Sequence, residues 1–70
     1  MKDERIEVNP AVMFGKPVIR GTRLTVEMIV RELEDGMSIE EMLSEYPRLT
    51  AEGIEAAKIF AEKYMTRSAA

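Results

Sequence analysis

The 70-residue chain contains no cysteine and no histidine. Their absence excludes disulfides, thiolate nucleophiles, zinc sites built from these residues, and acid–base catalysis by histidine. Long apolar runs are also missing, and residues 1–5 contain no apolar segment beyond Met1, so we expect neither a membrane span nor a signal peptide, and hence a cytoplasmic protein. Because a chain this short has no metal or disulfide to stabilise it, we expect it to form a homodimer or to bind a partner protein.

Charge is unevenly distributed along the chain, although the formal net charge is only -3. Residues 9–26 contain three cations and no acidic residue, whereas residues 27–45 contain seven acidic residues and one arginine. The acidic total argues against the strongly basic footprint expected of a protein that binds nucleic acid on its own. The distribution instead predicts a basic loop, Gly15 to Thr25, set beside acidic helices.

Residues 1–24 are predicted to form extended segments, with a short β-hairpin, and the basic loop. Ile6-Glu7-Val8 alternates apolar and polar side chains, Val12-Met13-Phe14 forms a second extended piece, and Val18-Ile19 has the β-branched character of a strand. Gly21 is expected to adopt a positive φ that few other residues accept.

Three helices are predicted over residues 25–66. The first runs from Val26 to Asp35, because Thr25 is a suitable N-cap and Gly36 a suitable end. Apolar residues on its inward side recur at helical spacing.

Two further helices follow from their own start signals. Ser38 and Glu41 form a capping box for the second helix, which ends before Pro47, and Thr50 caps the third. The third helix has a predicted inward face of Ile54, Ala57, Phe60, Ala61 and Tyr64. The chain is thus predicted to be a single, mainly α domain over residues 1–70, a three-helix bundle containing a helix-turn-helix, with a frayed tail at residues 67–70.

Cations that could contact nucleic acid lie outside the third helix. The first turns of that helix carry Glu52 and Glu55, which would repel phosphates. The predicted nucleic-acid contacts are therefore the cations of the basic loop and of the turn, namely Lys16, Arg20, Arg23 and Arg48. The alternative is that the arginines of the loop pair with the acidic helices and hold the N-terminal segment in place.

Acidic residues of the second helix form a second candidate surface. Glu40, Glu41 and Glu45 are predicted to bind a basic partner by electrostatic complementarity. We predict no catalytic residues, metal site or cofactor, because the paired carboxylates lack pocket-forming companions and the basic loop lacks the spacing of nucleotide-binding motifs.

The segments from Gly15 to Arg23 (GKPVIRGTR) and from Tyr46 to Thr50 (YPRLT) resemble a family of short prokaryotic proteins, domain of unknown function 433. The resemblance spans about residues 6–64. It implies a homeodomain-like or winged-helix-like trihelical domain, often encoded beside a PIN-like nuclease, and therefore a non-enzymatic antitoxin of a toxin–antitoxin pair. Such an antitoxin would bind the nuclease and operator DNA. The alternative hypothesis is a protein-interaction module whose acidic face docks on a basic partner without binding nucleic acid.

Overall fold

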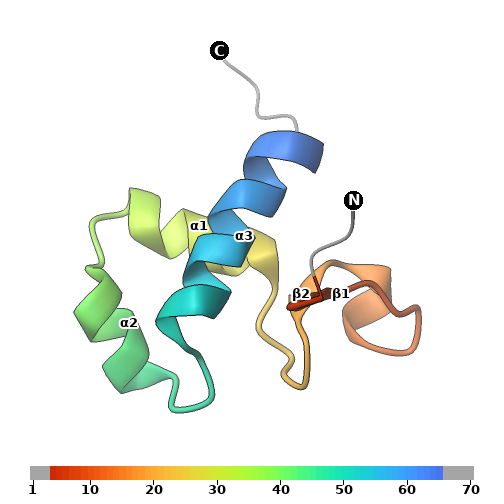
Figure 1. Ribbon diagram of the computed structural model, residues 1–70, viewed down its shortest axis with the longest axis horizontal. Helices are drawn as coiled ribbons and strands as arrows, with labels where there is room; N and C mark the ends of the chain where they lie inside the picture. The colour runs from red at the N-terminus through yellow and green to blue at the C-terminus, as the bar shows by residue number, and fades with distance from the viewer. Residues whose placement is uncertain (1–3, 66–70) are drawn as a thin grey trace.

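A computed structural model describes residues 4–65 and confirms the predicted mainly helical fold with an N-terminal hairpin. The predicted frayed tail, residues 67–70, lies outside the described residues. No helix within residues 4–65 is long and apolar enough to cross a membrane. The elements are, in chain order, β1 (Ile6–Glu7), the 3-10 helix η1 (Met13–Gly15), β2 (Val18–Ile19), α1 (Val26–Glu34), α2 (Ile39–Glu45) and α3 (Ala51–Tyr64) (Figure 1).

Each α-helix begins at a side-chain cap, as predicted. The hydroxyl oxygens of Thr25, Ser38 and Thr50 accept hydrogen bonds from backbone amides three residues later, at 3.1, 3.0 and 3.0 Å. The Glu41 carboxylate accepts from the Ser38 amide at 2.9 Å, which completes the capping box. Gly36 follows α1 with φ +105°, so the first helix ends where its glycine predicts.

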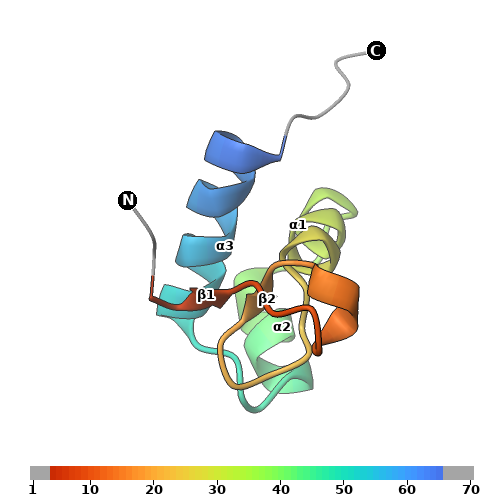
Figure 2. The same cartoon turned by 90° about the vertical axis from the view of Figure 1, so that its right-hand side faces the viewer.

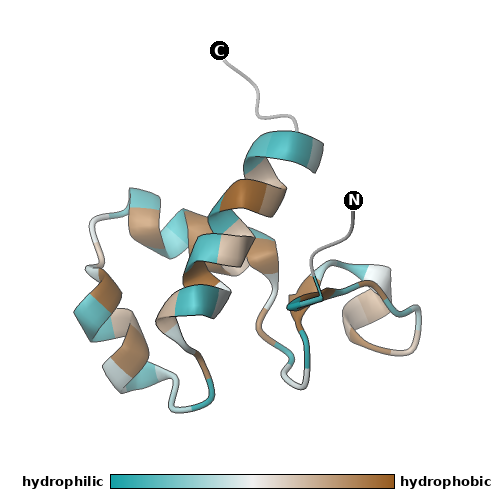
Figure 3. Ribbon diagram, in the orientation of Figure 1, coloured by the Kyte–Doolittle hydropathy of each residue, from teal (hydrophilic) through white to brown (hydrophobic). Residues whose placement is uncertain are grey.

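The longest helix, α3, is the element against which the others pack. It lies mainly against α1 and also contacts β1 and α2, while the hairpin and η1 lie together on one side of the helices (Figures 1 and 2). Apolar and polar bands alternate along α1 and α3, as expected for amphipathic helices (Figure 3). The buried core takes residues from every α-helix and both strands: Ile6, Ile19, Val26, Ile29, Met42, Leu49, Ile54, Ala56, Ala57 and Ala61.

The predicted inward face of α3 is correct except at its end. Ile54, Ala57 and Ala61 are buried and Phe60 packs against the core, but Tyr64 is 57% exposed. Tyr64 is the last residue of α3, and the last turn of this helix extends beyond the other described elements (Figure 1). The Tyr64 ring lies against that of Phe60, with centroids 4.8 Å apart.

The two short strands join the N-terminal segment to the helices. They pair antiparallel with Ile6 opposite Ile19, and an isolated bridge links Val18 to Thr25 at the start of α1. Gly53 of α3 lies beneath β2, and a Cβ added there would sit 3.7 Å from Ile19 Cγ2. The hairpin is therefore held against α3 by close packing.

The prediction of an extended segment over residues 12–14 is wrong. Met13–Gly15 forms η1, in which Met13 and Phe14 have φ of 49° and 60° and Gly15 of 82°. The connection between β1 and β2 reverses through consecutive turns, in which the Val12 amide donates to the Asn9 carbonyl at 2.8 Å and the Lys16 amide to Met13 at 3.1 Å. These turns satisfy the backbone locally, so the segment pairs with itself and not with a strand.

Candidate functional site: a groove between the basic loop and the helix-turn-helix

Internal hydrogen bonds close the turn at the centre of the basic loop. The Ile19 amide donates to the Leu24 carbonyl at 2.9 Å, and the Thr22 hydroxyl donates to the Ile19 carbonyl at 2.8 Å while accepting from the Leu24 amide at 3.0 Å. Gly21 has φ +83°, which confirms the expected positive value. The turn thus presents the neighbouring Arg20 and Arg23 side chains from a backbone that needs no contribution from either.

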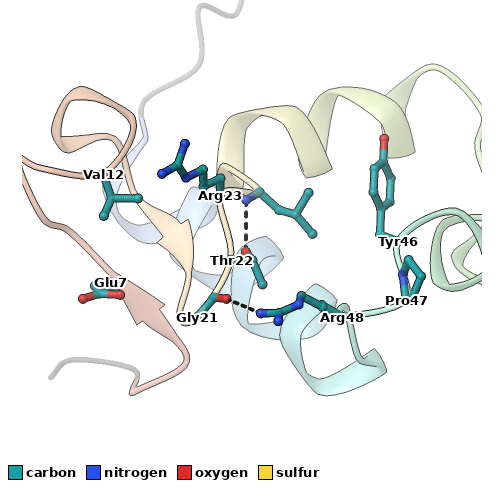
Figure 4. Close-up of a pocket in the computed structure, with 9 residues that line it drawn as sticks. Glu7, Val12, Gly21, Thr22, Arg23, Tyr46, Pro47 and Arg48 are labelled. Carbon is teal, nitrogen blue, oxygen red and sulfur yellow. Dashed lines mark hydrogen bonds between the residues drawn. The ribbon is translucent and has the colours of Figure 1, made fainter.

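Arg48 connects this turn to the helix-turn-helix. It lies between α2 and α3, and its Nη1 donates a hydrogen bond of 3.0 Å to the Gly21 carbonyl oxygen. Figure 4 shows its side chain reaching across to the turn. The helix-turn-helix connection and the basic loop are therefore adjacent, although no local sequence pattern indicates it.

A groove of about 500 Å³ lies between these two segments. Figure 4 shows Val12 and Glu7 on the side of the hairpin and Tyr46 and Pro47 on the opposite side. Apolar side chains make up much of the wall, and two guanidinium groups add positive charge. The lining residues are Glu7, Val12, Gly21, Thr22, Arg23, Leu24, Tyr46, Pro47 and Arg48.

Tyr46 is held in the groove wall by a carboxylate of α1. Its hydroxyl donates to both carboxylate oxygens of Glu32, at 3.1 and 3.2 Å. This hydrogen bond raises the pKa of the Tyr46 phenol, and partial burial and the charges of Glu32 and Glu45 raise it further. The phenol therefore stays protonated at neutral pH, and the ring has a fixed position.

The four predicted cations are not gathered at one place. Arg23 and Arg48 line the groove, whereas Lys16 and Arg20 do not. Lys16 Nζ lies 2.9 Å from Glu27 Oε1 of α1, with both side chains about half exposed, and Arg20 donates through Nε to the carbonyl of Glu4.

The charge environment of these cations differs as well. The hydrogen bond and the charge of Lys16 hold the pKa of the Glu27 carboxyl below its ordinary value. Arg23 has no hydrogen-bond or ion-pair partner within residues 4–65, so the alternative pairing of the loop arginines with the acidic helices is not found there. Arg20 does tie the loop to the N-terminal segment, through the Glu4 carbonyl. The ion pair between the basic loop and the acidic helices is made by Lys16, with Glu27 of α1.

The predicted acidic surface lies on α2, where Glu40, Glu41 and Glu45 are exposed. Glu41 is engaged in the capping box. Within the described part of the chain, Glu40 and Glu45 have no ion-pair partner. Residues 4–65 hold no group of three or more acidic side chains placed to bind a metal ion.

Sequence reasoning missed the apolar walls of the groove. Val12, Leu24 and Tyr46 come from three separate segments and carry no local signal of a site. The one sequence signal for the groove was the arginine in each of its two facing segments. It identified Arg23 and Arg48 but none of the other lining residues.

Comparison with known proteins identifies the family to which this chain belongs and two proteins that it resembles. A family described as "Protein of unknown function (DUF433)" matches residues 6–61. The uncharacterized protein y4eO of Sinorhizobium fredii (strain NBRC 101917 / NGR234) is 41% identical over 59 residues, which cover 84% of this chain and 27% of that protein. A crystal structure of a DUF433 member protein from Anabaena variabilis ATCC 29413 matches with a TM-score of 0.82 and 37% identity, over 86% of this chain and 59% of that one. The chain therefore spans about a quarter of the first protein and about three fifths of the second.

Proposed function

We propose, given that this chain belongs to the DUF433 family of proteins of unknown function, that it is the antitoxin of a prokaryotic toxin–antitoxin pair. It acts by binding alone, to a PIN-like nuclease and to operator DNA. The observation that carries the DNA contact is the groove beside the helix-turn-helix connection, which Arg23 and Arg48 both line. Exposed guanidinium groups suit the phosphates of a duplex, since a guanidinium can donate two parallel hydrogen bonds to one phosphate.

The mode of DNA binding follows from the charges of α3. Its first turns expose Glu52 and Glu55, so this helix is unsuited to enter a groove lined by phosphates. Contact would instead be made by the edge that carries Arg23 and Arg48, mainly to the backbone of the DNA. Two neutralised phosphates per copy correspond to a slope of about -2 in a plot of log affinity against log salt concentration.

Arg23 offers the cleanest test, because it has no partner within residues 4–65 whose loss would disturb the fold. The probe is a labelled duplex from the region upstream of the protein's own gene, titrated by fluorescence anisotropy at several salt concentrations. Arg23→Ala is expected to weaken binding and to reduce the magnitude of the salt slope by about 1 per copy. Lys63→Ala, an exposed cation on α3, is the matched control and should change neither.

Lys16 and Arg20 remain predicted contacts of smaller weight, because each is already engaged within the chain. Their alanine variants should weaken binding less than Arg23→Ala does. An Arg23→Ala protein with wild-type affinity and salt slope would remove the DNA contact from the proposed function.

The contact with the nuclease is proposed for α2. Glu40 and Glu45 are exposed without ion-pair partners among the described residues, and a nuclease needs a cationic groove for its substrate. Glu41 and Glu45 are one helical turn apart, where like charges repel by about 0.2–0.5 kcal/mol, a cost that binding to a cationic surface would offset.

Co-expression with the neighbouring nuclease tests this second contact. The wild-type chain should co-purify with the nuclease at low salt and inhibit it, and a Glu40→Lys, Glu45→Lys double variant should do neither. Glu62→Lys, an exposed substitution on α3, is the control. If the wild type captures the nuclease but binds no DNA, the protein is the interaction module of the alternative hypothesis. Failure to co-purify would contradict both.

A further inference from the structure

The loop between the strands exposes apolar side chains that the core does not use. Phe14 is 93% exposed, and Val8 and Met13 are 60% and 37% exposed. We call these three residues the apolar knob. Met13 and Phe14 have left-handed backbone, which is unfavourable for residues with large side chains. An exposed aromatic ring held on a strained backbone indicates a function in binding.

The groove beside the knob has the chemistry to receive an aromatic ring. Leu24, Tyr46 and Pro47 supply apolar walls, and the guanidinium groups of Arg23 and Arg48 can lie against the face of a ring. Its volume of about 500 Å³ is ample for one phenylalanine side chain. Phe14 does not fill the groove of its own chain, because almost all of its surface is exposed.

We propose that a second copy of this chain occupies the groove, with Phe14 of each copy inserted into the groove of the other. The knob and the groove are neighbours on one molecule, because Val12 lines the groove and lies two residues before Phe14. A two-fold axis beside Val12 therefore allows both insertions at once, which is the self-complementary arrangement of a closed dimer. This pairing does not rest on the proposed function, but it uses the same groove. Insertion of Phe14 and contact of DNA with Arg23 and Arg48 in that groove would therefore compete.

The area available is sufficient for a specific dimer. Each inserted phenylalanine removes about 150–250 Å² of its own surface from water, and the groove walls lose a similar amount. With Met13 and Val8 added, the pair approaches the roughly 1,000 Å² that specific interfaces need. Half of that area, about 500 Å² per copy, is about a tenth of the 5148 Å² surface of each copy. Repulsion between the cations of the two copies is limited for two reasons. Glu27 forms an ion pair with Lys16, and the carboxylate of Glu7 lines the groove together with the two arginines.

Sedimentation equilibrium over a wide concentration range tests the dimer. Phe14→Asn removes the ring and suits left-handed backbone, so the fold is retained, as circular dichroism would verify. The wild type should dimerise, and this variant should raise the dimer dissociation constant roughly 30-fold or more. Ile39→Asn, which alters an apolar side chain 42% exposed on α2, is the control and should leave the constant unchanged. A monomeric wild type, or a Phe14→Asn protein that dimerises like the wild type, would overturn the inference.

Two variants together test reciprocal insertion. Val12→Lys keeps the knob and obstructs the groove, while Phe14→Asn keeps the groove and lacks the ring. Each should be monomeric alone, and an equimolar mixture should form a heterodimer with one insertion, weaker than the wild type. Isotope-filtered NMR of the mixed-label wild-type dimer supplies an independent reading, with expected intermolecular contacts from the Phe14 ring to Leu24 and Tyr46. A dimer without those contacts, or two monomeric variants that do not associate when mixed, would refute the insertion.

Discussion

Arg48 donates a hydrogen bond from Nη1 to the carbonyl oxygen of Gly21, 3.0 Å away and 27 positions earlier in the chain. The bond joins the turn of the helix-turn-helix to the basic loop, and both of its residues line the groove (Figure 4). Loop geometry and groove shape are therefore coupled through one exposed side chain.

Replacing Arg48 by alanine should lower the free energy of unfolding by about 0.5–1.5 kcal/mol, because one hydrogen bond from a charged donor is lost in an exposed setting. Urea denaturation measures the change. Lys63→Ala, which removes an exposed cation elsewhere, should stay within about 0.5 kcal/mol of the wild type. Equal stabilities of the Arg48→Ala protein and the wild type would mean that the bond is not maintained in solution.

The ion pair between Lys16 and Glu27 predicts a dependence of stability on pH. Because the folded state lowers the pKa of Glu27, the pair stabilises the fold at neutral pH, and this contribution is lost as the pH falls through the lowered pKa. In a Lys16→Ala variant the Glu27 pKa should rise towards its ordinary value, which NMR titration of the carboxyl group would report. The stability difference between variant and wild type should vanish in acid, and a difference that persists there would contradict this assignment.

The N-cap of α1 provides a prediction about stability alone. Thr25 is buried, and its hydroxyl oxygen accepts from the Met28 amide at 3.1 Å. Thr25→Ala should cost about 1–2 kcal/mol, and Thr25→Ser considerably less because serine keeps the capping oxygen. Thermal and urea unfolding would measure both, and equal losses in the two variants would show that packing of the methyl group, and not the cap, dominates.

The hydrogen bond from Tyr46 to Glu32 predicts that the stability of the fold falls at high pH. Because the folded state raises the phenol pKa, the stabilisation is complete below the ordinary tyrosine pKa and is lost as the pH rises through the raised value. In a Tyr64→Phe background the ultraviolet absorbance of tyrosinate reports Tyr46 alone. Adding Glu32→Gln should bring its pKa down towards the ordinary value, and an unchanged titration curve would argue against the bond.

Phe14 has left-handed backbone, which glycine adopts more easily, so replacing it by glycine should stabilise the monomer. Phe14→Gly should raise the free energy of unfolding of the monomer by up to about 1 kcal/mol at protein concentrations too low for dimerisation, since strain at φ 60° is relieved. The greater flexibility of unfolded glycine limits the gain. Denaturation at two protein concentrations separates this effect from any loss of dimer, and a destabilised monomer would show that the turn depends on the phenylalanine side chain.

Much of the helical fold could be predicted because its determinants are local. The side chains of Ser38 and Thr50 each accept a hydrogen bond from the amide three residues later. The amide of Gly36, which ends α1, donates to the carbonyl of Leu33, three residues earlier.

The conformation of η1 could not be predicted, because Val12-Met13-Phe14 has the composition of a strand. That composition does not reveal the turn hydrogen bonds from Val12 to Asn9 and from Lys16 to Met13. The prediction that Tyr64 is buried was wrong for a similar reason. Helical periodicity indicates which side of a helix faces inward but not where along the helix the facing surface ends.

The candidate site was predictable only in part. Arg23 and Arg48 could be named from charge, but the groove that they share depends on a contact between distant segments. Lys16 could be named equally well, and its pairing with Glu27 separates it from that groove. Charge patterns indicate which side chains are available for binding, whereas packing determines which of them lie together.

The turn from Ile19 to Leu24 closes on itself through its own backbone and the Thr22 hydroxyl. The side chains of Arg20 and Arg23 contribute no atom to that closure, although Arg20 ties the loop to the N-terminal segment through the Glu4 carbonyl. Substitutions at these two positions would therefore change the charge that the loop displays while leaving in place the hydrogen bonds that close the turn.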